Sequence, residues 1–113
     1  MRGLLIDPEA QTIVELEVGG NDIEDDIEKA IDCCEYGFAY CYIDGPNHEN
    51  VLFNDVVNNT DPDEDIYGFL FHFDGFPFIG KAMILGSDAK DDFIGTTLSV
   101  QKAYNQIKWF GAR

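Results

Sequence analysis

The segment Gly75–Lys81 carries the spacing of a phosphate-binding loop. Its sequence matches the pattern Gly-x-x-x-x-Gly-Lys, in which backbone N–H groups and a lysine surround the phosphates of a nucleotide. That chemistry needs small residues between the glycines, a hydroxyl side chain after the lysine to hold Mg²⁺, and a helix to follow. Here the intervening residues are bulky, Ala82 occupies the hydroxyl position, and Ala82–Leu85 has the pattern of a strand. We therefore expect a turn that places apolar side chains such as Phe78 in the core, and no nucleotide site.

A second segment resembles the start of a calcium loop. Asp61, Asp63 and Asp65 alternate as the first three ligands of such a loop do. The remaining positions do not fit, because Ile66 stands where the loop needs glycine and His72 where it needs a bidentate glutamate. The sequence predicts a solvated acidic loop here, and no metal site.

The cysteines and histidines do not form a catalytic or zinc-binding pattern. Cys33, Cys34 and Cys41 lack the Cys-x-x-Cys spacing of a zinc ribbon or redox site, and His48 and His72 are too few to hold zinc alone. No serine or cysteine lies in the local signature of an activated nucleophile. We expect a protein that is not an enzyme, with no catalytic residue, no cofactor, and reduced thiols as in the cytoplasm.

The net charge is the unusual property of the chain. It has 22 Asp and Glu residues against 7 Lys and Arg, which gives a formal net charge of −15. Such a field repels nucleic acid and anionic membranes, and it attracts cationic partners in a salt-dependent way. The charge therefore predicts a basic protein as partner, with no direct contact to nucleic acid or membrane.

Many of the carboxylates fall on one expected helix. Ile23, Ile27 and Ile31 recur at helical spacing, and Asn21 or Asp22 can cap the N-terminus. A helix that rises about 1.5 Å per residue can present charges at spacings near the roughly 1.7 Å per charge of duplex DNA. The expected partner-binding residues are the acids of this helix and of the acidic loop: Asp22, Glu24, Asp25, Asp26, Glu28, Asp32, Asp61, Asp63, Glu64 and Asp65. The alternative is that these acids only keep the protein soluble.

The elements that position these residues belong to a small α+β domain. A chain of 113 residues fits one domain, residues 1–113, with one core. A C-terminal amphipathic helix is expected from Val100 to Phe110, ended by Gly111. Strands are expected at Gly3–Ile6, Thr12–Val18, Phe38–Ile43, Val51–Phe53, Ile66–Phe73 and Ala82–Leu85. The order ββαββββα implies a mostly antiparallel sheet of five or six strands with two helices packed on one face.

Both ends of the chain carry strand and turn motifs of a known type. These are Arg2–Pro8 followed by Thr12–Val18, then Ile79–Asp88 and the C-terminal helix. Together they resemble a family of small uncharacterised proteins encoded by phages and mobile elements. The resemblance implies no activity and transfers no catalytic residue. It implies that the gene is a phage accessory gene, and such genes often encode compact acidic proteins that block host DNA-binding or defence machinery.

Charge and resemblance together predict a phage-type accessory protein in the cytoplasm of a host cell. Such a protein would bind and inhibit a basic nucleic-acid-binding or defence protein. DNA mimicry would be one form of that binding, and a homodimer is one oligomeric state that the sequence allows. Two alternatives stay open. One is a small-ligand or metal-binding domain that uses the aromatic strand Tyr67–Phe73, and the other is a structural or oligomeric phage component.

Overall fold

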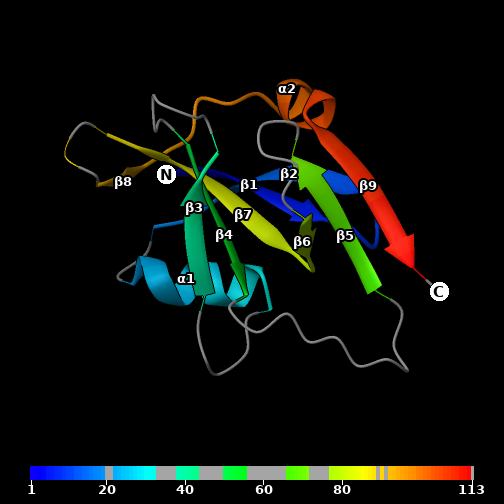
Figure 1. Cartoon of the computed structure of the whole chain (residues 1–113). Coiled ribbons are helices and arrows are strands. Elements are labelled where there is room, and N and C mark those ends of the chain that lie inside the picture. The colour runs from blue at the N-terminus through cyan, green and yellow to red at the C-terminus, as the bar shows by residue number, and fades with distance from the viewer. Residues whose placement is uncertain are drawn as a thin grey trace.

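The computed structural model describes residues 1–19, 22–32, 38–43, 50–55, 66–71, 77–88, 90 and 92–112. These residues contain nine strands and two helices (Figure 1). In chain order they are β1 (Arg2–Asp7), β2 (Thr12–Glu17), α1 (Ile23–Ala30), β3 (Phe38–Tyr42), β4 (Asn50–Asp55), β5 (Ile66–Phe71), β6 (Pro77–Ile79), β7 (Ala82–Ser87), β8 (Phe93–Ile94), α2 (Val100–Asn105) and β9 (Ile107–Ala112).

The strands of the described residues form two antiparallel sheets. The main sheet has the order β2-β1-β7-β4-β3, with β8 paired to the end of β7, and the small sheet has the order β6-β5-β9. Each pairing of neighbouring strands is antiparallel. The mostly antiparallel architecture is therefore confirmed, and the expectation of one sheet of five or six strands is wrong.

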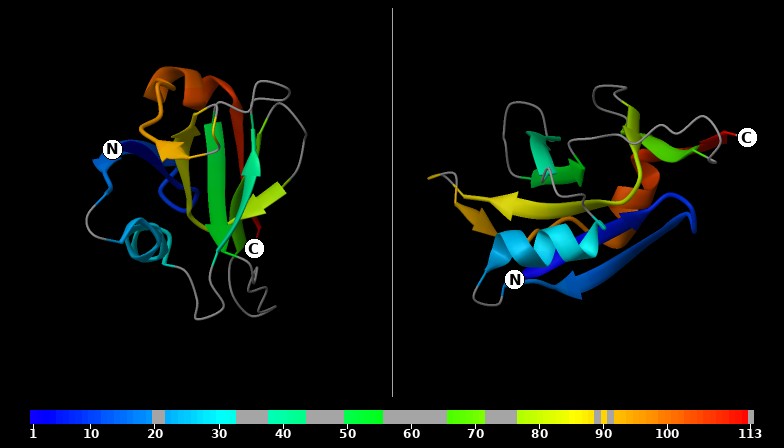
Figure 2. Two further views of the ribbon diagram at one scale, coloured as in Figure 1. Left: turned by 90° about the vertical axis from the view of Figure 1, so that its left-hand side faces the viewer. Right: turned by 90° about the horizontal axis from the view of Figure 1, so that it is seen from below.

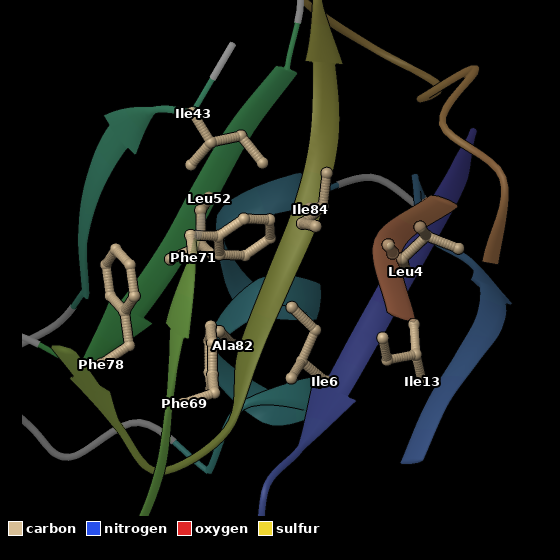
Figure 3. Packing of buried hydrophobic residues seen from close by; sticks show 11 residues of the cluster. Leu4, Ile6, Ile13, Ile43, Leu52, Phe69, Phe71, Phe78, Ala82 and Ile84 are labelled. Atoms are coloured by element: carbon tan, nitrogen blue, oxygen red, sulfur yellow. The ribbon is translucent and has the colours of Figure 1, made fainter. Parts of the chain in front are cut away.

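The main sheet is covered on both faces. On its inner face, side chains of β1, β4 and β7 meet the aromatic side chains of the small sheet and Ala103 of α2, as Figure 3 shows for most of the set: Leu4, Ile6, Leu52, Ala82, Ile84, Phe69, Phe71 and Phe78. The opposite face of the main sheet is here called the α1 face. Its buried residues Val51, Phe53, Met83 and Leu85 pack against Ile27 of α1 and the C-cap residue Ile31.

The two helices consequently lie on opposite faces of the main sheet, and the expectation that both pack on one face is wrong. The reason is visible in β7, where all six residues are buried. Successive side chains of a strand point to opposite faces, so a strand that is buried throughout needs cover on both faces. The sheet meets that need with α1 on one face and the small sheet with α2 on the other (Figure 2).

The C-terminal segment is half helix and half strand. The helix α2 begins after the N-cap Ser99, as expected near Val100, but ends at Asn105, and β9 pairs with β5 from there. Ile107 and Trp109 are half-buried against the inner core, while Lys108 between them is exposed. This alternation with β-branched and aromatic residues is typical of a strand, so the helix predicted to Phe110 is wrong.

Several local predictions are confirmed. The strands β1, β2 and β7 lie where their patterns predict them, and β3 and β4 pair as the two antiparallel strands of the expected hairpin. The predicted strand Ile66–Phe73 is β5 as far as Phe71, and Phe73 lies outside the described residues. The described chain contains no helix that is long and apolar enough to cross a membrane.

Candidate interaction surface

The helix α1 is held on the sheet by apolar contacts and by its own acidic side chains. Ile27 is fully buried against the α1 face. Asp22 caps the N-terminus, as the sequence predicts, because its Oδ1 accepts a hydrogen bond from the Asp25 backbone N–H at 3.2 Å. Asp26 Oδ2 accepts from the Gly19 backbone N–H at 3.1 Å and so fixes the connection from β2. Two predicted partner-binding residues therefore have structural roles.

Two more of the predicted acids form ion pairs within the chain. Asp25 pairs with Lys29 at 2.8 Å, one turn along the helix, and Asp32 pairs with Lys81 at 2.7 Å. The expectation that Asp32 lies on the helix is wrong, because α1 ends at Ala30 and Asp32 follows it with a φ of +53°. The hydrogen bond from Lys29 to Asp25 raises the pKa of Lys29, and the hydrogen bond from Lys81 to Asp32 raises the pKa of Lys81. Both pairs are largely exposed, so each stabilises the fold only slightly.

The remaining predicted acids of the helix are Glu24 and Glu28. They lie four residues apart, on adjacent turns of one side of α1. Glu24 is exposed and Glu28 is half-buried, and neither has a hydrogen bond or an ion pair with any described residue. These two carboxylates are the helix acids most available to a partner.

The structure places the phosphate-loop pattern in the fold as a strand connection. Pro77–Ile79 forms β6, Phe78 is buried in the inner core, and β7 rather than a helix follows Lys81. The lysine that would bind phosphate is held by Asp32 instead. The expected burial of Phe78 in the core is confirmed, but residues 77–79 form a strand and not the expected turn, and Gly75 and Phe76 lie outside the described residues.

Several of the other predicted site residues lie outside the part of the chain that the structure describes. The loop acids Asp61, Asp63, Glu64 and Asp65 lie outside the described residues, as do His48, His72, Cys33 and Cys34. Among the residues that are described, no three His, Cys, Asp or Glu side chains group as metal ligands would. In the aromatic strand proposed for a small ligand, Phe69 and Phe71 are fully buried between the two sheets.

Sequence reasoning missed an aromatic cluster on the α1 face. Tyr40 lies across from Phe53 in the β3–β4 pair, with ring centroids 5.8 Å apart, and its ring meets Phe93 of β8 edge-on, also at 5.8 Å. Phe38 and Tyr42 flank it on the same face of β3. Although the aromatic rings around it are buried or half-buried, Tyr40 remains 56% exposed. The signal was present, because aromatic residues occupy alternate positions throughout Phe38–Tyr42.

The described cations do not all lie away from the α1 face, because Lys29 and Lys81 pair with Asp25 and Asp32, and the exposed Lys90 lies between β7 and β8. Arg2 pairs with Glu15 and also donates to the carbonyl oxygens of Thr96 and Leu98, at 2.9 and 2.7 Å. The exposed Lys102 and Lys108 lie on α2 and β9. In Figure 1 and the left view of Figure 2, α2 and the start of β9 are at the opposite end of the molecule from α1. Lys102 and Lys108 are therefore away from the acidic helix.

Comparisons with protein-family models, with curated proteins and with solved structures give no match to this chain. The resemblance to the phage-encoded family therefore stays a prediction.

Proposed function

We propose that this protein binds a basic segment of another protein on the α1 face. The observation that carries the proposal is the exposed ring of Tyr40, which shares a sheet face with the acidic helix in a chain of net charge −15. A lysine or arginine can lay its aliphatic stem and its cation against such a ring, while the negative field of the chain favours the positive charge.

The residues proposed for contact are Tyr40, Glu24 and Glu28. Asp25 and Asp32 can add to them, because Lys29 is exposed and Lys81 is half-buried, and a partner's cation can replace a surface lysine at little cost. Asp22 and Asp26 act mainly by holding α1 in place.

The narrower proposal is that the partner is a nucleic-acid-binding or defence protein of a host cell, inhibited in the cytoplasm by occupation of its basic site. Its support is the net charge and the resemblance to the phage-encoded family. DNA mimicry would be one form of this binding. The eight residues of α1 rise only about 12 Å, so a DNA-like row of charges would need carboxylates from elsewhere in the chain as well.

The test is a pull-down from host lysate at low and high salt, followed by affinity measurement with the retained protein. Glu24→Gln with Glu28→Gln raises the net charge by two, and so does the control Gln101→Lys with Asn105→Lys on the exposed side of α2. We expect the first pair to weaken binding about three- to tenfold and the control to have a smaller effect, because contacts of surface charges act over short range.

Tyr40→Ala should weaken binding further if the ring holds a cation. Two results would overturn the proposal. One is an equal loss of affinity in the two charge variants, which would mean that only net charge matters. The other is unchanged affinity in both Tyr40→Ala and the glutamine variant.

A further inference from the structure

The edge strands of the two sheets differ in how they are protected against pairing with another chain. Native edge strands are usually blunted by charged residues, proline, short length or cover from another element. Across the described residues, β2 carries Glu15 and Glu17, β6 is three residues long and begins with Pro77, and β9 carries Lys108. The strand β2 is covered as well, because the Tyr104 hydroxyl accepts a hydrogen bond from the Ile13 backbone N–H at 2.8 Å.

In the part of the chain that the structure describes, the strand β3 shows none of these protections. Its sequence is Phe-Ala-Tyr-Cys-Tyr, without charge, proline or glycine, and it ends the main sheet opposite β2. In the described part of the chain it pairs with β4 alone. Ala39 and Tyr40 in the middle of the strand are both exposed.

The register of the hairpin shows which backbone groups of β3 face outward. Ile43 and Asn50 are a hydrogen-bonded pair, since the Ile43 N–H donates to the Asn50 carbonyl at 3.2 Å. Hydrogen-bonded and non-hydrogen-bonded pairs alternate along an antiparallel ladder. Tyr40 and Phe38 therefore belong to non-hydrogen-bonded pairs with β4, and their N–H and C=O groups point away from the sheet.

We propose that the outer edge of β3 accepts an extended, lysine- or arginine-rich segment of the partner as an added strand. This proposal rests on the proposed function for the basic character of the partner. Main-chain hydrogen bonds to Tyr40 and Phe38 would supply affinity, and alternate side chains of the added strand would lie on the α1 face beside the Tyr40 ring. A second copy of this chain is a poorer occupant of the edge, because each copy brings a net charge of −15.

The experiment uses a synthetic nine-residue peptide that alternates lysine with valine. N-methylation of every second residue leaves it one edge that can form hydrogen bonds and prevents it from stacking on itself. The control peptide has the same sequence with every backbone nitrogen methylated, so its side chains and charge are unchanged. Affinities for the full chain are measured by calorimetry, and hydrogen exchange of the Tyr40 amide is followed by NMR.

We expect the first peptide to bind at least about tenfold more tightly than the control, since each backbone hydrogen bond adds affinity that charge alone does not. Exchange of the outward Tyr40 amide should slow on binding, while the Ala39 amide, which faces β4, should change little. Tyr40→Val is a useful second variant, because it removes the ring and keeps the backbone edge.

Three results would overturn the proposal. Equal affinity of the two peptides with the same salt dependence would mean that charge alone retains them, which leaves the proposed function standing. Sedimentation showing that the chain pairs with itself, with the Tyr40 amide protected in the absence of peptide, would make a second copy the occupant. If neither peptide binds, the edge does not accept a basic strand, and the pull-down with the glutamine variants decides the proposed function independently.

Discussion

The side chain of Asn54 joins the two sheets, and Asn54→Asp should loosen that junction in a pH-dependent way. Asn54 lies on β4 and is 8% exposed. Its Nδ2 donates hydrogen bonds to the carbonyl oxygens of Ile79 and Lys81, at 3.1 and 3.0 Å. Those carbonyls flank Gly80, whose φ of +81° turns the chain from β6 in the small sheet to β7 in the main sheet. One amide therefore satisfies both carbonyls of the connection.

The size of the effect follows from these two bonds. Each buried hydrogen bond contributes about 0.5 to 1.5 kcal/mol, and an acceptor left without a partner adds to the loss. Aspartate has the same shape but no N–H group, and its anion would face two carbonyl oxygens. We expect Asn54→Asp to lower the free energy of unfolding by about 3 kcal/mol or more at neutral pH.

Protonation should relieve part of that loss. Burial and the two carbonyl oxygens disfavour the anion, so the pKa of the introduced carboxyl should rise above the usual value of about 3.9. A raised pKa contributes stability that is fully present below the unfolded-state pKa and is lost as pH rises through the folded-state pKa. The deficit relative to the wild-type protein should therefore be smallest below about pH 4 and largest at neutral pH.

The assay is urea unfolding of the wild type, Asn54→Asp and Asn54→Leu in parallel from pH 4 to pH 7. The leucine variant loses the same hydrogen bonds without a titrating group, so its deficit should not depend on pH. A deficit for Asn54→Asp below about 1 kcal/mol at neutral pH, or one that parallels the leucine variant at every pH, would refute the reasoning.

Three further predictions concern other contacts. Gly68→Ala should lower the free energy of unfolding by about 2 kcal/mol in thermal melts, because a Cβ there would lie 2.3 Å from the Phe78 carbonyl oxygen. Asp22→Ala should lower it by about 1 kcal/mol and Asp22→Asn by much less, since the helix cap needs an acceptor rather than a charge. Lys81→Met should remove a small stabilisation by Asp32. Because the pKa of Lys81 is raised above 10.5, the gap to wild type should stay constant from neutral pH up to that value and narrow above it in urea unfolding.

Local sequence signals predicted the elements whose structure is decided within a few residues. The Asp22 cap and the isoleucine spacing fixed the start and the buried side of α1. The hairpin of β3 and β4 followed from two apolar runs with a turn between them. Each of these patterns is local, so one sequence was enough to find it.

The division into two sheets depends on contacts that no local pattern contains. The central strand of the small sheet, β5, pairs with β9, about forty residues away, and apolar strands in one run look alike whichever sheet they join. The same ambiguity affected Ile107 and Phe110, whose spacing suits a helix although the alternation from Ile107 to Trp109 suits a strand. Pairing with β5 makes this segment a strand. Gly68 contributes to the pairing, because its lack of a side chain leaves room for the Phe110 ring.

The candidate surface was only partly predictable, because some of its contacts join residues that are far apart in the sequence. The acids of α1 were found because charge is visible in sequence, and the Asp25–Lys29 pair is readable from its spacing. The pair between Asp32 and Lys81 joins residues 49 positions apart, so its existence needed the fold. The exposed Tyr40 was missed because its ring contacts to Phe53 and Phe93 come from three strands.

These contacts decide how the acidic helix should be probed. Charge reversal of Asp25, Asp26 and Asp32 would break two ion pairs and leave the Gly19 N–H without its acceptor, so lost binding would not separate a partner contact from a displaced helix. Glu24 and Glu28 hold nothing in place among the described residues. Their replacement changes the field of the α1 face while the cap, the tether to β2 and the buried Ile27 remain, and a loss of affinity can then be attributed to the partner.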